Sequence, residues 1–206
     1  STRKESSAAS DVYKRQEDIG DGDHTTLSCI PATAMGKSKL LIKEAGVLAG
    51  IEVAKEIFNR FDPTMKVEVF INDGTEVKPG DVAMVVEGKV QSLLQTERLM
   101  LNVMQRMSGI ATMTRKYAKQ LEGTHTRVLD TRKTTPGMRI LEKMAVKIGG
   151  GVNHRIGLFD MILLKDNHVD FAGGIDKAIN RAKEYCKEKG LSLIHISEPT
   201  RLGMIS

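Results

Sequence analysis

Residues 127–151, RVLDTRKTTPGMRILEKMAVKIGGG, contain a short β-rich run, a polar loop and an amphipathic segment that ends at three glycines. The run at 127–130 predicts a strand, and the apolar spacing near 138–148 predicts a helix. The same order of strand and helix recurs at 161–165 and 175–189. Because strands that alternate with helices are typical of parallel sheets, we predict an α/β fold for this part of the chain.

The second predicted strand indicates how far this fold extends. Met161-Ile162-Leu163-Leu164 is apolar without alternation, as expected of a parallel strand that is buried on both faces. Only about two strand–helix units are present. We therefore expect residues 108–190 to form an α/β domain whose parallel sheet has an open edge.

Cationic side chains follow both predicted strands, and the carboxyl ends of parallel strands meet at one edge of a sheet. Six candidate binding residues follow the strands or the glycines between them: Thr131, Arg132, Lys133, His154, Arg155 and Lys165. Two such cations 4 Å apart repel by about 4 kcal/mol at an effective dielectric near 20, so the group predicts a site for a polyanion. Phosphate esters and dicarboxylates fit this need.

Some of these residues have a structural alternative. His154 alone is also explained as a structural hydrogen bonder, and the three glycines as a linker or a helix terminator. The chain has no GxxxxGK[ST] run and no GxGxxG after a strand, which excludes a P-loop and a Rossmann dinucleotide site.

Residues 17–107 predict a different architecture, a small α+β open-sandwich domain with a helical linker. Strands are expected at 38–42, 66–71 and 83–87, with a hairpin turn at Pro79-Gly80. The apolar spacing within residues 46–61 fits a helix, through Val47, Ile51, Ala54 and Phe58.

A longer helical pattern covers residues 90–121, with a broad apolar face. Its opposite side carries Arg98, Asn102 and Gln105, which share one stripe. This stripe is explained either by simple exposure to solvent or by a role in a pocket or subunit contact. Ser108-Gly109 predicts a break between two helices, and we place the domain boundary there, between residues 107 and 108.

The ends of the chain differ from the rest. Residues 1–16 are polar and rich in Ser and Ala, and residues 191–206 follow a predicted helix end without a sustained pattern. Both resemble translated adapter sequence, so we expect foreign or disordered tails around an authentic piece of residues 17–190, truncated on both sides.

Composition limits the function classes. The 206 residues carry a net charge of +5, and no apolar run is long enough to cross a bilayer. Cys29 and Cys186 lie far apart without a CxxC, which favours reduced thiols and a cytoplasmic location. With no Trp, three Tyr and five Phe, the chain offers few rings on which bases could stack. We therefore expect neither a nucleic-acid nor a membrane partner.

Four runs in order resemble the quinolinate phosphoribosyltransferase family, the nicotinate-nucleotide pyrophosphorylases of NAD biosynthesis. They are ERLMLN at 97–102, LDTRKTTPG at 129–137, GGGVNHR at 149–155 and LKDNH at 164–168. The segment EDIGDGDHTT at 17–26 is similar to the start of that family. The likeness covers residues 17–190 and lacks the later barrel strands, which in the family supply acidic residues for metal and ribose and a phosphate loop. The resemblance therefore implies that residues 108–190 form an incomplete α/β-barrel domain, since a closed barrel has about eight strand–helix units, and that the chain is poorly stable and inactive alone.

The resemblance implies a glycosyltransferase that acts in pyridine nucleotide biosynthesis. Quinolinate displaces pyrophosphate from phosphoribosyl pyrophosphate in the presence of Mg²⁺, and loss of CO2 then gives nicotinate mononucleotide. Mg²⁺ is expected to be bound mainly with phosphoribosyl pyrophosphate, and no residue of this chain is assigned to it.

The resemblance also implies roles for the candidate residues. Arg132, His154 and Arg155 correspond to the carboxylate-binding set, and Arg98 is expected to reach in from the partner subunit of a homodimer. Lys133 and Lys165 correspond to the catalytic lysines near the phosphates and the reacting centre. Two alternatives stay open: a related phosphoribosyltransferase associated with molybdenum transport, and a basic module that binds nucleic acid.

Overall fold

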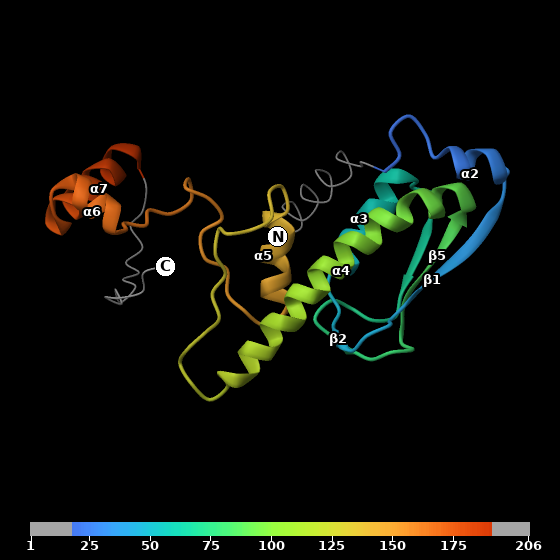
Figure 1. The fold of residues 1–206 in the computed structure, drawn as a ribbon, viewed down its shortest axis with the longest axis horizontal. Helices are drawn as coiled ribbons and strands as arrows, with labels where there is room; N and C mark the ends of the chain where they lie inside the picture. The colour runs from blue at the N-terminus through green and yellow to red at the C-terminus, as the bar shows by residue number, and fades with distance from the viewer. Residues whose placement is uncertain (1–17, 191–206) are drawn as a thin grey trace. The chain divides into compact units, whose positions relative to one another are not determined.

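The computed structural model describes residues 18–190, which fall into two compact units divided between His154 and Arg155 (Figure 1). The helices and strands of the first unit are α2 (His24–Cys29), β1 (Met35–Leu41), β2 (Gly46–Val47), α3 (Ile51–Phe61), β3 (Lys66–Val69), β4 (Glu76–Val77), β5 (Val82–Lys89), α4 (Val90–Gln120) and α5 (Arg139–Ile148). Those of the second unit are α6 (Asp166–Ala172) and α7 (Ile175–Lys189). None of the described helices is long and apolar enough to cross a membrane.

Two antiparallel sheets form the strand-rich part of the first unit. The larger has the order β1-β5-β3, and the smaller pairs β2 with β4. The predicted turn forms, since Asp81 N donates to Lys78 O at 3.2 Å, but the hairpin prediction was wrong. The strands on either side of this turn, β4 and β5, belong to different sheets. Strand β4 pairs with β2, next to the bond that Leu48 N donates to Thr75 O.

The apolar spacing predicted for residues 46–61 is confirmed. Val47, Ile51, Ala54 and Phe58 are all at most 3% exposed. The helix starts later than predicted, at Ile51, because Gly46–Val47 belongs to β2. Helix α3 packs against β5 and α4, and full burial of a side chain of this size stabilises the fold by about 1.5–3 kcal/mol.

The loop before α3 also requires a glycine. Gly50 has a φ of +108°, and a β-carbon there would stand 3.1 Å from Met104. The first amide of the helix, that of Ile51, donates to the Asp73 carboxylate at 2.8 Å. This cap comes from a distant loop, so the start of α3 depends on the 73–75 turn.

Helix α4 is one continuous helix of 31 residues, so the predicted break at Ser108-Gly109 was wrong (Figure 1). Ser108 Oγ donates to Ala49 O at 3.1 Å and accepts from Ala49 N at 3.0 Å. Met107 and Ala111 on either side of the pair are fully buried. These contacts outweigh the roughly 1 kcal/mol that a glycine costs inside a helix. The predicted domain boundary at 107/108 therefore falls inside α4.

Two hydrophobic clusters meet on α4. One joins Val103, Met107 and Ala111 of α4 to the inner faces of α3 and α5, and the other joins Met100 and Met104 to α3 and the large sheet. The expected α+β open sandwich is thus confirmed, with the helices packed on the sheet and α5 added along the far half of α4.

The strands predicted for the later part of the chain are mostly absent from the described residues. Residues 127–130 form a single parallel bridge, Leu129 to Val152, and residues 161–165 form no strand. Ile162 is 40% exposed rather than buried on both faces. Residues 18–190 offer no further strand at which these backbone groups could pair, which explains the difference.

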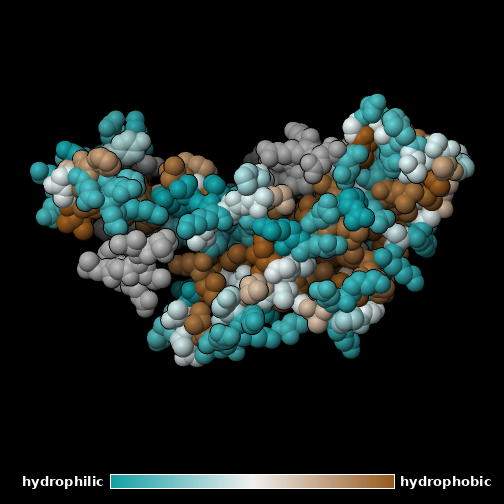
Figure 2. Space-filling view, in the orientation of Figure 1, coloured by the Kyte–Doolittle hydropathy of each residue, from teal (hydrophilic) through white to brown (hydrophobic). Residues whose placement is uncertain are grey.

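Residues 155–190, the described part of the second unit, contain the 7-residue helix α6 and the 15-residue helix α7. Helix α6, which the sequence did not predict, ends at Gly173 with a φ of +80°. The amides of Gly173 and Gly174 donate to the last carbonyls of α6, and α7 follows as predicted. Leu158, Phe159 and Phe171 of this unit are 71–92% exposed, and Figure 2 shows brown patches over this part of the surface.

Candidate anion-binding site

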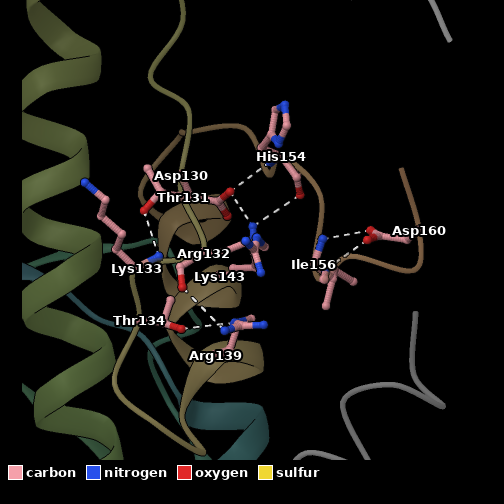
Figure 3. Close-up of polar contacts among 11 residues, drawn as sticks. Asp130, Thr131, Arg132, Lys133, Thr134, Arg139, Lys143, His154, Ile156 and Asp160 are labelled. Carbon is pink, nitrogen blue, oxygen red and sulfur yellow. Dashed lines mark hydrogen bonds and ion pairs between the residues drawn. The ribbon is translucent and has the colours of Figure 1, made fainter. Parts of the chain in front are cut away.

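The loop that follows Asp130 is held by the first residue of α5 (Figure 3). Arg139 donates from Nε to Thr134 Oγ1 at 3.1 Å and from Nη2 to Arg132 O at 3.4 Å. Within the loop, Lys133 N donates to Thr131 Oγ1 at 3.0 Å. These bonds fix the backbone of the predicted binding residues, while the Lys133 side chain extends toward α4 (Figure 3).

The far end of the same loop is tied to α4 and α5. Arg106 donates to Glu142 Oε1 from Nε at 3.0 Å and from Nη2 at 2.7 Å, and Nη2 also reaches Thr135 Oγ1 at 2.9 Å. Thr135 N donates to Glu142 Oε2 at 3.3 Å. Burial, the strongest single influence, raises the pKa of Glu142, but the hydrogen bonds from Arg106 and Thr135 outweigh it. The pKa therefore lies below the ordinary 4.5.

A buried ion pair lies at the base of the loop. Asp130 and Lys143 contact each other, and their side chains are 5% and 3% exposed. Asp130 Oδ1 also accepts from His154 N at 2.8 Å, and Lys143 Nζ donates to His154 O at 3.2 Å. The Asn153 amide nitrogen, oriented toward these acceptors, donates to Asp130 Oδ2 at 2.9 Å and to Lys143 O at 2.8 Å.

The backbone brings the same two segments together. Val152 N donates to Val128 O at 2.8 Å, and Asp130 N donates to Val152 O at 3.2 Å. Residues 128–130 and 152–154 therefore run parallel, as the carboxyl ends of neighbouring strands would. Arg132 follows the first segment and His154 ends the second, so two predicted carboxylate-binding residues are carried by one bonded unit.

The three glycines act as a close-packed helix terminator. A β-carbon at Gly149 would stand 2.5 Å from Ala111 O, and one at Gly151 would stand 2.7 Å from Val146. Gly150 has a φ of +96°. Gly149 and Gly151 are therefore required by packing against α4 and α5, and the alternative of a helix terminator describes the three glycines better than that of a linker.

A cavity of 280 Å³ opens between this loop, α4 and α5. Its lining includes Thr131 and Lys133 from the predicted set, together with two ion pairs, Arg106 with Glu142 and Lys143 with Asp130. Within residues 18–190, Lys133 has no ion-pair partner. It therefore gives the cavity a net positive charge that a bound anion would neutralise.

The other predicted residues of the first unit take different positions. Arg98 is exposed on α4, as are Asn102 and Gln105, in agreement with the predicted stripe. Arg132 is half-buried. The His154 ring points away from the Asp130–Lys143 pair (Figure 3), and its Nε2 is buried without a hydrogen-bond partner among the described residues. A buried nitrogen in this state is able to bind a ligand group.

Two predicted residues belong to the second unit. Arg155 is 7% exposed and donates from Nη1 to Met161 O at 3.2 Å. Lys165 is exposed at the start of α6, where its amide donates to His168 Nδ1 at 2.9 Å. The first unit thus carries Thr131, Arg132, Lys133 and His154, of which Thr131 and Lys133 line the cavity and Arg132 and His154 do not, and the second unit carries Arg155 and Lys165.

Sequence reasoning missed the residues that hold the site. They are Arg106, Asp130, Arg139, Glu142 and Lys143. One signal was present, because Glu142 and Lys143 lie next to Leu141 and Ala145 on the buried side of α5. Charged residues on the apolar face of a helix indicate buried partners.

A larger cavity lies elsewhere in the first unit. It measures 560 Å³ and is lined mainly by apolar residues of the β1–β2 connection and of α4 between Leu101 and Lys116. Its lining includes Gln105 of the predicted α4 stripe but none of the six candidate binding residues, so we place the candidate site at the smaller, charged cavity.

Comparison with known proteins shows the family to which the chain is similar. The family model described as quinolinate phosphoribosyl transferase, N-terminal domain, matches residues 23–108, and the model of the C-terminal domain matches residues 110–199. The chain is 47% identical over 179 residues to quinolinate phosphoribosyltransferase [decarboxylating] 1b of Nicotiana tabacum, covering 86% of this chain and 50% of that protein.

Two further relatives support the same family. The chain is 45% identical over 178 residues to the chloroplastic nicotinate-nucleotide pyrophosphorylase [carboxylating] of Arabidopsis thaliana, covering 86% of this chain and 51% of that protein. The crystal structure of NadC from Streptococcus pyogenes aligns with a TM-score of 0.81 at 41% identity, covering 86% of this chain and 64% of that one. The chain spans about half the length of the curated relatives it matches.

Proposed function

The chain belongs to the quinolinate phosphoribosyltransferase family, and we propose that its residues serve phosphoribosyl transfer to quinolinate. The ring nitrogen attacks the anomeric carbon of phosphoribosyl pyrophosphate, and pyrophosphate leaves. The carboxylate next to that nitrogen then departs as CO2, and a proton takes its place, which gives nicotinate mononucleotide. The matched family and the names of the relatives support quinolinate over the acceptor of a molybdenum-associated paralogue.

The unpaired Lys133 in the charged cavity is the observation that carries the proposal. Arg106 and Lys143 beside it are already neutralised by Glu142 and Asp130. Lys133 can therefore stabilise the departing pyrophosphate or the negative charge that develops on the ring. We assign the same role to Lys165.

Quinolinate is a dicarboxylate, and its recognition is assigned to groups that pair with carboxylates. Arg132 and Arg155 can each bind a carboxylate through two parallel hydrogen bonds. The unpartnered Nε2 of His154 can donate a further one. Arg98 is proposed to act across a homodimer, which its exposure on α4 permits.

Mg²⁺ is proposed to come with the substrate. Among residues 18–190, no three or more His, Cys, Asp or Glu side chains are grouped so that they could hold a metal ion. Mg²⁺ keeps several waters and commonly binds through substrate phosphates, so the pyrophosphate group would supply its ligands. A cytoplasmic location stays a prediction, since the Arabidopsis relative is described as chloroplastic.

Calorimetric titration of quinolinate into the purified chain tests the proposal, with Arg132→Ala as the binding variant. We expect the wild type to bind and R132A to bind at least about tenfold more weakly, since a hydrogen bond to a charged group is worth about 1.5–3 kcal/mol. Arg60→Ala on α3 is the matched control and should bind like the wild type. A folded wild-type protein that does not bind quinolinate would refute the substrate assignment.

A further inference from the structure

The backbone of His154 is held on both sides by one buried ion pair. Its N–H donates to Asp130, and its carbonyl accepts from Lys143. The two side chains contact each other and are almost fully buried. His154 therefore cannot shift relative to Asp130 without breaking bonds that solvent is poorly placed to replace.

The pair is also close in sequence to Arg132, the other predicted carboxylate ligand of the first unit. Asp130 is two residues before Arg132, and Asn153 adds a second link between the segments through Asp130 Oδ2. The backbone segments that carry Arg132 and His154 are thus linked through Asp130. A dicarboxylate of fixed shape needs a fixed spacing between the groups that bind it.

Stability alone does not explain this arrangement. Removing two charges from water costs several kcal/mol each, and well-packed apolar pairs often stabilise a fold as well as a buried ion pair does. An apolar pair would, however, make no directed bonds to the N–H and carbonyl of His154. Compared with an apolar pair, the charged pair therefore adds a fixed position for the backbone of His154.

We propose that Asp130 and Lys143 are positioning residues that set the spacing between Arg132 and His154 for a dicarboxylate ligand. The proposal rests on the proposed function. Lys143 lines the cavity, yet its charge is used by Asp130, so it acts through His154 and does not bind the ligand itself.

The test uses the full chain with three variants: Lys143→Met, Asp130→Asn and the double variant. Quinolinate affinity is measured by calorimetry at a temperature at which circular dichroism shows each variant to be folded. We expect K143M to bind about 10–100 times more weakly, by analogy with the loss of a residue that orients a metal ligand. In the double variant, thermal stability should recover relative to K143M, because no unpaired buried charge remains, whereas affinity should not recover.

Asp62→Asn is the matched control. Asp62 follows the last residue of α3 in the first unit. Its carboxylate is 9% exposed and accepts from Ser92 Oγ of α4 at 2.7 Å. D62N should lower the melting temperature and leave quinolinate affinity unchanged. If affinity instead recovers with stability in the double variant, or if folded K143M binds like the wild type, the pair is structural only and the proposal fails.

If K143M does not fold, amide hydrogen exchange of the wild type tests whether the Asp130–Lys143 pair positions His154 for the ligand. On addition of quinolinate to the wild type, the amide of His154 should become at least about tenfold more protected, because the ligand and the pair hold the same segment. The amide of Ile51, which donates to the Asp73 carboxylate at 2.8 Å, is the matched reference and should not change. Equal changes at both amides would overturn the proposal, while a wild type that does not bind would count against the proposed function instead.

Discussion

Gly149 lies so close to α4 that a β-carbon on it would stand 2.5 Å from the carbonyl oxygen of Ala111. Because this oxygen belongs to the backbone of α4, it cannot move away by a change of side-chain rotamer. Gly149→Ala should therefore push α5 away from α4 and destabilise the protein by about 1–3 kcal/mol, the usual cost of overpacking. Denaturant unfolding measures this loss, and an unchanged midpoint would contradict the close packing of the glycine segment.

Gly109 is the matched control, because it is also a glycine but has open space around the position of its β-carbon. It lies inside α4, where alanine is preferred over glycine by about 1 kcal/mol. Gly109→Ala should therefore raise the unfolding midpoint. A loss of stability would indicate that the helix needs its flexibility at this position.

Glu142 predicts an acid-sensitive contribution to stability. Its pKa in the folded protein is below the ordinary 4.5, so the folded state binds the proton less tightly than the unfolded chain does. The contribution is fully present above about pH 4.5 and is lost as the pH falls through the folded value. Melting curves of wild type and Glu142→Gln should converge in this acidic window, and a constant difference between them down to pH 2 would be inconsistent with it.

The raised pKa of Asp73 predicts a change of stability with pH in the opposite direction. Burial raises the pKa of its carboxyl above the ordinary 3.8, despite the amides of Ile51 and its neighbours that favour the charged form. The folded state therefore binds the proton more tightly, and stability falls as the pH rises from 3.8 through the folded value. Asp73→Asn retains an acceptor for Ile51 N and should remove this fall. Chemical unfolding of the wild type and of Asp73→Asn at pH 3.5 and pH 7 measures this fall in stability.

Lys133 should bind pyrophosphate through its charge. Lys133→Met is expected to weaken pyrophosphate binding by at least about tenfold at low salt, since a charge-assisted hydrogen bond contributes about 1.5–3 kcal/mol. The effect should shrink as salt screens the ligand. Lys39→Met on strand β1 is the control for the loss of one exposed lysine, and equal losses in both variants would indicate nonspecific attraction only.

The sequence predicted the elements whose signal is local. The spacing of Val47, Ile51, Ala54 and Phe58 predicted a helix, and all four are buried, although Val47 lies in β2 rather than in α3. It failed where distant contacts overrule a local signal. The Ser108-Gly109 pair looks like a break, but the hydroxyl of Ser108 bonds to Ala49 and keeps α4 continuous.

The candidate site shows the same limit. Loop positions after strands predicted Arg132 and Lys133 as binding residues, because ligand residues gather at such places, and this stays a prediction. The pairing of Asp130 with Lys143 could not be predicted, since the two are separated by a loop whose path depends on Arg106 and Arg139. Residues 161–165 were predicted as a strand from composition alone, and strand formation needs a neighbour as well as apolar residues.

Helix α4 has a consequence for how the first unit folds. Its 31 residues span about 46 Å, and its inner face belongs to both hydrophobic clusters. Met104 belongs to one cluster and Met107 to the other, and the two residues are about one turn apart on α4. Loss of the packing in either cluster therefore removes support from the helix on which the other cluster depends. The sheet and α5 are therefore joined in one cooperative folding unit, and residues 18–154 should unfold in a single transition rather than in two.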